Sequence, residues 1–72
     1  MQPQSLKLPT NFINFLVNLP ETGMGYQLVK VFLKSGKILR QHKVLNSEFL
    51  MLEDNEIITV KEIDKIELEK RI

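Results

Sequence analysis

Side chains capable of catalysis or metal binding are few and scattered in this 72-residue chain. There is one histidine, His42, and no cysteine, so no cluster of imidazole and thiolate ligands is available to a metal ion. The serines Ser5, Ser35 and Ser47 fall in expected turns or in the N-terminal arm, outside any nucleophile-elbow context. We therefore expect no catalytic residue, no metal site and no cofactor, and we expect that the protein is not an enzyme.

His42 sits between two basic residues, Arg40 and Lys43, on an expected strand. A general base needs an orienting carboxylate and a nucleophile or water site, and the neighbouring sequence supplies neither. We interpret His42 as an ordinary surface histidine, with a functional titrating group as the alternative. The acidic run at residues 53–56 lacks the spacing and central glycine of a calcium loop, so we interpret it as an acidic turn.

Residues 19–23 read LPETG, which is similar to the sorting motif that sortases cut at cell surfaces. A working signal of that kind precedes an apolar membrane segment and a basic tail near the C-terminus. Here the expected strands follow instead. We interpret the motif as a helix stop followed by a glycine hinge, because Pro20 ends helices and Gly23 adopts turn conformations without strain.

The strongest pattern is a set of basic residues on an expected hairpin. Residues 28–45, LVKVFLKSGKILRQHKVL, alternate apolar and polar on either side of the turn at residues 35–36, and every charge among them is positive. Residues 46–72 contain eight acidic and four basic residues, so a chain of net charge +1 has two halves of opposite sign. The candidate contacts for a partner or a nucleic acid are Tyr26, Lys34, Lys37, Arg40, His42, Lys43 and Lys61.

Strict alternation along the strands divides these basic residues between the two faces of the sheet, so they do not form one continuous basic surface. It puts Lys30 and Lys34 on one face of their strand and separates Arg40 from Lys43 on the next. Binding of single-stranded nucleic acid needs exposed aromatic rings between the basic side chains. We expect Phe32 to be a core residue, so Tyr26 is the remaining candidate for stacking on a base. The alternative interpretation is that the lysines solvate an edge hairpin and discourage aggregation.

Hydrophobic periodicity predicts a mainly β fold with a short N-terminal helix. Residues 1–9 are expected to form a loose arm, and Thr10 caps a helix over residues 10–19, where apolar residues recur at spacings of 3 and 4. Its Phe12 and Phe15 are interpreted as core contacts, with an exposed partner-binding helix as the alternative. Strands are predicted at residues 26–34, 37–45, 48–52, 56–60 and 65–69, with one helical turn at 61–64. Such short, evenly spaced strands predict a small five-stranded barrel over residues 26–69.

Length and composition define the class of protein. Seventy-two residues make one domain, residues 1–72, with 43% apolar residues to build a small core, so self-association would add stability. The near-neutral net charge excludes binding to nucleic acid or lipid by bulk charge alone. The N-terminus has no basic region followed by a long apolar stretch, so we expect a cytoplasmic protein with no membrane contact.

The helix, the strand-SGK-strand hairpin and the late helical turn resemble the Sm-like family, and many SH3-like barrels share the pattern. The hairpin is similar to the family's first motif, and residues 59–68, TVKEIDKIEL, are similar in position to the second. The resemblance implies a ring-forming protein that binds single-stranded RNA. The Asp and Asn that usually hold bases are not recognisable in residues 46–52, and Glu62 follows Lys61 where the second motif has Arg-Gly or Lys-His.

Two functions follow from these patterns. The first is a non-catalytic interaction module in which the basic hairpin meets the acidic half of a second subunit or of a protein partner. The second is an Sm-like RNA-binding protein in which Lys34, Lys37, Arg40 and Lys61 contact phosphate and Tyr26 stacks on a base.

Overall fold

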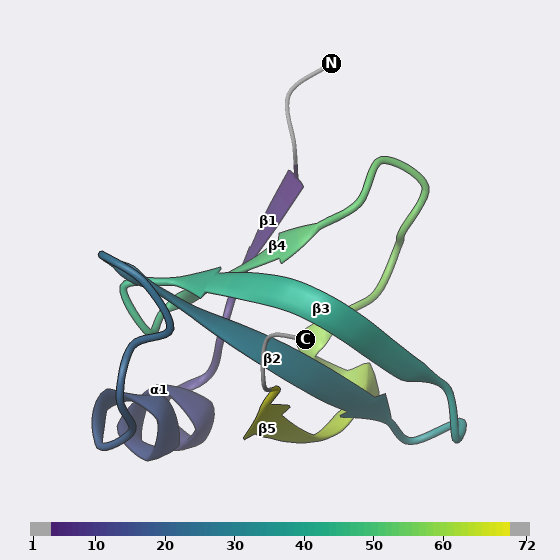
Figure 1. The fold of residues 1–72 in the computed structure, drawn as a ribbon. Coiled ribbons are helices and arrows are strands. Elements are labelled where there is room, and N and C mark those ends of the chain that lie inside the picture. Colours follow the sequence, from purple (N-terminus) through teal and green to yellow (C-terminus); the bar gives the residue numbers. More distant parts are fainter. Residues whose placement is uncertain (1–3, 70–72) are drawn as a thin grey trace.

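The fold is mainly β, with five antiparallel strands and one short helix (Figure 1). The computed structural model describes residues 4–69. Its elements in chain order are β1 (Gln4–Lys7), α1 (Thr10–Val17), β2 (Tyr26–Leu33), β3 (Ile38–Leu45), β4 (Phe49–Leu52), the 3-10 turn η1 (Val60–Glu62) and β5 (Ile63–Leu68).

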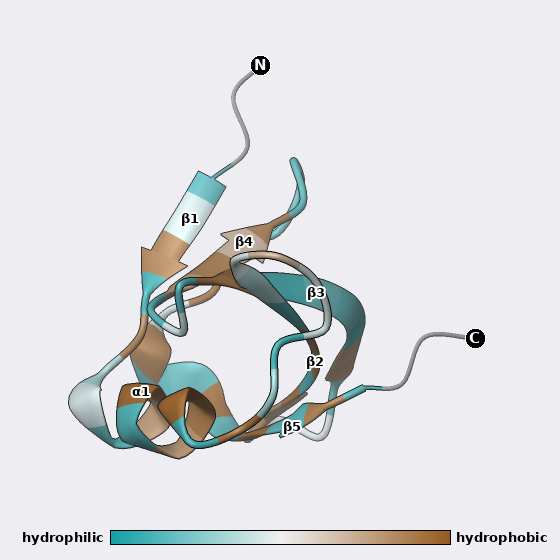
Figure 2. Ribbon diagram, turned by 60° about the vertical axis from the view of Figure 1, so that its left-hand side comes forward, coloured by the Kyte–Doolittle hydropathy of each residue, from teal (hydrophilic) through white to brown (hydrophobic). Residues whose placement is uncertain are grey.

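The five strands form one sheet in the order β1-β4-β3-β2-β5. The sheet curls strongly, and α1 lies at its open end between β1 and β5 (Figure 2). It is not closed into a barrel, because β1 pairs only with β4 and β5 pairs only with β2 among the described residues. In the described part of the chain, no helix is long and apolar enough to cross a membrane.

The core fills the concave side of the curled sheet. Its fully buried members are inward-facing residues of the long strands together with one helix residue, Leu16, which fixes α1 to the sheet. Phe12 packs against this core from the helix, as predicted, whereas Phe15 is 47% exposed and the core interpretation of it is wrong. The contiguous core cluster of the described residues consists of Leu8, Leu16, Val29, Val31, Leu33, Leu39, Val44, Leu50, Leu52, Ile63 and Ile66.

The predicted loose arm is wrong for its residues 4–7, which form β1; residues 1–3 lie outside the described part. β1 pairs with β4 in a register that sets Leu6 opposite Leu50, so the arm covers an edge that would otherwise be bare. The strand predicted at residues 56–60 does not form. This segment is irregular and leaves Ile57 89% exposed, because the edge of β4 that it would have used is taken by β1.

A β-bulge in β3 changes which side chains face outward. Gln41 has φ of 57°, and the β2–β3 register shifts between Val29 and Val31. Alternation therefore restarts after Gln41, so that Arg40 and Lys43 are both exposed while His42 is buried. The prediction that Arg40 and Lys43 occupy opposite faces is wrong, because it assumed an unbroken period of two.

The C-terminal end of α1 is held by a buried glutamine that no motif had indicated. Gln27 is 1% exposed, and its Nε2 donates to the carbonyl oxygens of Leu16 at 2.9 Å and Leu19 at 3.2 Å. Its Oε1 accepts from Ser47 at 3.3 Å. One inward side chain of β2 thus satisfies carbonyls at the end of the helix and ties the β3–β4 turn to them.

Candidate functional site

Three of the predicted contact residues come together at one end of the molecule. Lys34 and Lys37 from the β2–β3 turn and Lys61 from η1 line one hollow, although Glu62 lines it as well. The carboxylate of Glu62 is already engaged, because it accepts from the Thr59 amide at 2.8 Å and closes the capping box of η1. Glu62 keeps its negative charge, but three ammonium groups against one carboxylate leave the lining with a net positive charge.

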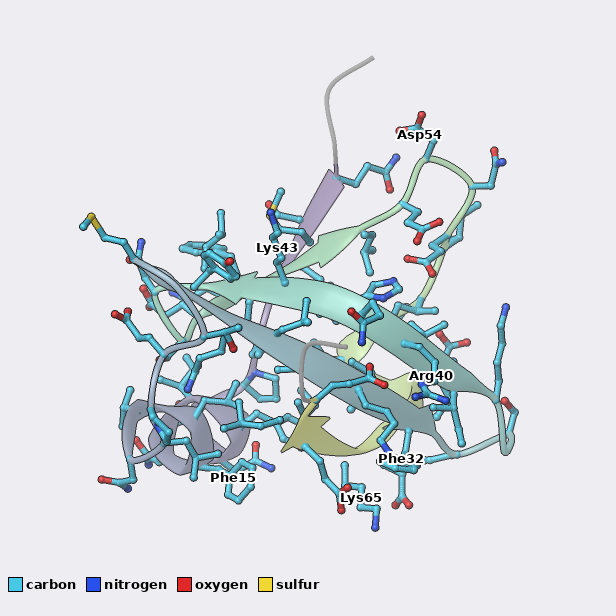
Figure 3. The ribbon with its side chains drawn as sticks, viewed as in Figure 1. Phe15, Phe32, Arg40, Lys43, Asp54 and Lys65 are labelled. Carbon is cyan, nitrogen blue, oxygen red and sulfur yellow. The ribbon has the colours of Figure 1, made fainter. Side chains whose placement is uncertain are left out.

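The other predicted contacts lie elsewhere. Lys43 is at the opposite end of β3 from the hairpin turn (Figure 3), and its Nζ lies 5.0 Å from the centroid of the Tyr26 ring. Gly23 also approaches this ring, since an added Cβ at Gly23 would lie 2.4 Å from the ring atom Cε1. Lys43 and Gly23 therefore both take up surface of the Tyr26 ring, which leaves less of it for stacking on a base.

Phe32 is not a core residue. It faces outward from β2, beneath two ammonium groups: Lys65 Nζ is 4.7 Å and Lys30 Nζ 5.5 Å from its ring centroid (Figure 3). The outward position follows from strand alternation, since its neighbours Val31 and Leu33 point into the core. The sequence pattern had suggested the reverse, because residues 31–33 are all apolar.

Arg40 is committed to an intramolecular pair. Its Nε and Nη2 donate to Oε2 of Glu69 at 2.7 and 2.6 Å, and the amide of Gln41 donates to Oε1 at 2.7 Å. The Gln41 bond and the Arg40 guanidinium hold the pKa of Glu69 below its usual value, against burial, which raises it. Glu69 thereby satisfies the amide that the bulge leaves outside the strand ladder, and Arg40 is not free for phosphate.

His42 is buried rather than on the surface, which corrects its interpretation as a surface histidine. Its Nδ1 lies 2.7 Å from the carbonyl oxygen of Arg40, and its Nε2 lies 2.8 and 2.9 Å from the carboxylate oxygens of Glu56. Both ring nitrogens face acceptors, so both donate only in the imidazolium form. The bulge at Gln41 explains the burial, because it turns His42 to the inner side of β3.

Glu56 reaches His42 from the loop that follows β4. Burial raises the pKa of its carboxyl, but the hydrogen bond from the Glu53 amide, the His42 contact and the charge of Lys37 outweigh burial, and the pKa lies below its usual value. The sequence did not indicate this pairing, since 14 positions separate the two residues and neither belongs to a motif.

A second hollow of the surface lies between the helix and the last strand. It has a volume of about 390 Å³, and its apolar walls come from α1 and β5. Phe15 contributes one exposed wall (Figure 3). Ile66, near the middle of β5, contributes to the opposite wall. The full lining is Asn11, Phe12, Phe15, Lys65, Ile66 and Glu67.

The outer edge of β5 runs along this groove. The amide of Glu69 donates to the carbonyl of Leu28 at 2.8 Å, so in the β2–β5 register the hydrogen-bonded pairs involve Glu69, Glu67 and Lys65. The backbone groups of the residues between them, Ile66 and Leu68, therefore point away from β2. No other strand of the described chain pairs with them.

Comparison with protein-family models, with curated proteins and with solved structures found no match.

Proposed function

We propose that the protein is a non-catalytic interaction module that associates with a second copy of itself along the free edge of β5. The observation that carries the proposal is that this edge has unpaired backbone groups and runs beside an apolar groove. A sheet edge of this kind accepts an added strand, whose main-chain bonds supply affinity while side chains supply specificity.

The side chains of β5 are self-complementary about Ile66. In an antiparallel pair of two β5 strands centred on this residue, Ile66 meets Ile66 of the second copy, and Lys65 meets Glu67 in both directions. Such a two-fold contact is isologous, so the Lys65–Glu67 pair occurs twice and the Ile66–Ile66 pair lies once on the axis. Lys65 and Glu67 are about half exposed and only 3.3 Å apart within one chain, so both are available to exchange partners.

Charge reversal tests this pairing. Lys65→Glu or Glu67→Lys puts like charges opposite each other at two places, and with cross-strand pairs worth about 0.2–1 kcal/mol each, we expect the dimer to weaken roughly 5-fold or more. Mixing the two variants, or combining both changes in one chain, restores opposite charges and should restore association. Lys34→Glu makes the same change of charge away from β5 and is the matched control.

The measurement is sedimentation equilibrium or light scattering over a range of concentration at low and high salt. Part of the association should survive high salt, because main-chain bonds and the apolar groove do not depend on charge. A wild-type chain that stays monomeric at every concentration in both buffers would refute the proposal. So would equal loss in Lys34→Glu and Lys65→Glu, which would point to net charge instead of the pairing.

The Sm-like or SH3-like barrel is an alternative arrangement of this sheet, because closing the barrel would use the β5 edge that we propose pairs with a second copy. A curled sheet in the order β1-β4-β3-β2-β5 needs only contact between its two outer strands to become a five-stranded barrel. The short N-terminal helix and the turn before the last strand support the likeness. An experimental structure of the assembled protein would test it through the positions of β1 and β5.

A second candidate function is binding of single-stranded RNA. It is favoured by one observation, the hollow that gathers Lys34, Lys37 and Lys61. If these lysines contact phosphates, affinity for a uridine- or adenine-rich oligomer should fall steeply with salt and be lost when all three are changed to Gln. Absence of binding at about 50 mM salt, where phosphate contacts are strong, would eliminate this candidate.

A further inference from the structure

The residues His42, Glu53 and Glu56 form a compact group that the proposed self-association does not use. We call it the His42 cluster. One potential ligand atom from each side chain lies within 4.8 Å of the other two. Zinc bound by imidazole nitrogen and carboxylate oxygen at about 2.1 Å in a tetrahedron has ligand atoms about 3.4 Å apart. The exposed Glu53 side chain would have to move closer, and the His42–Glu56 pair, now 2.8 to 2.9 Å apart, would have to open by about 0.5 Å to admit the ion.

The surroundings of His42 orient its ring as in a metal-binding histidine, and this observation does not depend on the two carboxylates. The ring is buried, its side chain only 4% exposed, and Nδ1 is 2.7 Å from the Arg40 carbonyl, an oxygen that only accepts. Nδ1 must therefore hold a proton, and Nε2 points at the two carboxylates. Metal-binding histidines are oriented in this way, with the distal N–H donated to a backbone carbonyl.

The carboxylate of Glu56 is also held in place by a hydrogen bond from the backbone. Its Oε1 accepts from the Glu53 amide at 2.9 Å, which fixes the carboxylate against the loop. A shallow surface hollow opens over this loop and gives an ion a route from solvent. Lys37 also lines the hollow and lowers the affinity for any cation, but its side chain is exposed and long enough to turn outward.

We propose that the His42 cluster binds a divalent transition-metal ion of the zinc type. Nε2 of His42 and the carboxylates of Glu53 and Glu56 are its protein ligands. The ion takes the place of the proton on Nε2 and ties the loop after β4 to the middle of β3. Imidazole with two carboxylates suits zinc, whereas calcium takes only oxygen ligands. Three protein ligands leave a fourth position for water or for a side chain of a partner.

Glu53→Gln is the most informative variant. Among residues 4–69 the Glu53 side chain makes no hydrogen bond or ion pair, and its amide, which holds Glu56, is unaffected by the change. The His42–Glu56 pair therefore stays intact while one ligand is lost. Glu21→Gln removes an exposed carboxylate far from the cluster and is the matched control.

The experiment titrates zinc chloride into the tag-free full chain by calorimetry. We expect wild type and Glu21→Gln to bind equally and Glu53→Gln to bind at least about tenfold more weakly, with calcium weaker still. Nitrogen-15 spectra of the His42 ring should show Nε2 shifting with zinc while Nδ1 keeps its proton. Thermal unfolding without metal should be the same for Glu53→Gln and wild type.

Three results would overturn the proposal. The first is zinc binding that leaves the His42 ring signals unchanged. The second is equal affinity in wild type and Glu53→Gln, and the third is equal loss in both glutamate variants, which would mean that zinc binds surface carboxylates in general.

Discussion

Replacing Gln27 by Met tests whether one buried amide holds the helix on the sheet. The substitution keeps the length of the side chain and removes its hydrogen bonds to Leu16 and Leu19. Each such bond contributes about 1 kcal/mol, and a buried carbonyl left without a donor costs about 1–3 kcal/mol. The Leu16 oxygen still accepts from the Leu19 amide, so the groups that lose this partner outright are the Leu19 oxygen, the Pro20 oxygen at 3.4 Å and the Ser47 hydroxyl at 3.3 Å.

We therefore expect Gln27→Met to lower the free energy of unfolding by about 2–4 kcal/mol. A domain of this size has about 4–11 kcal/mol in total, so the loss is large and should lower Tm by at least about 10 °C. Gln4→Met is the matched control, because Gln4 is exposed on β1. Urea unfolding followed by circular dichroism measures both. A loss below about 0.5 kcal/mol, or one equal to that of the control, would refute the reasoning.

Two further predictions concern the strand faces and acid stability. Leu50→Ala should lower the free energy of unfolding by about 2–5 kcal/mol, because Leu50 is fully buried. Phe49→Ala should lower it clearly less, because Phe49 faces the other side of β4 and is partly exposed. Equal losses in urea unfolding would contradict this. The lowered pKa of Glu69 means that, as pH falls, the unfolded chain takes up a proton at this carboxylate before the folded chain does, so its stabilisation is present above the usual glutamate pKa and is lost as pH falls through the folded pKa. Glu69→Gln should therefore flatten the fall in stability between about pH 5 and pH 3, and an unchanged slope would exclude the pair with Arg40 and Gln41 as a cause.

Much of the fold was predictable because local signals agree with it. The helix, the hairpin around Gly36 and the turn before β5 follow from periodicity and glycine, and each lies within a few residues of its predicted place. The role of β1 was not predictable, since its only strong signal is Leu6 and its pairing depends on a strand more than 40 positions away.

The site was less predictable than the fold for one physical reason. A single bulge at Gln41 moves every later side chain of β3 to the opposite face. The sequence does not signal the positive φ of this residue, because positive φ is predicted mainly at glycine and Gln41 is not a glycine. This shift buries His42, exposes Lys43 beside Tyr26 and creates the amide that Glu69 satisfies. An alternation pattern read from sequence carries no signal for such an event.

The pairing of β1 with β4 joins strands more than 40 positions apart in the sequence. Such a contact requires closure of a long loop, so we expect β1 to dock on β4 after the β2–β3 hairpin, with its short loop, has formed. Until then one edge of β4 is bare, and the same edge is exposed if β1 detaches. Because β1 has four residues, of which Leu6 alone is apolar, we expect it to be the strand that two copies of the chain exchange most readily.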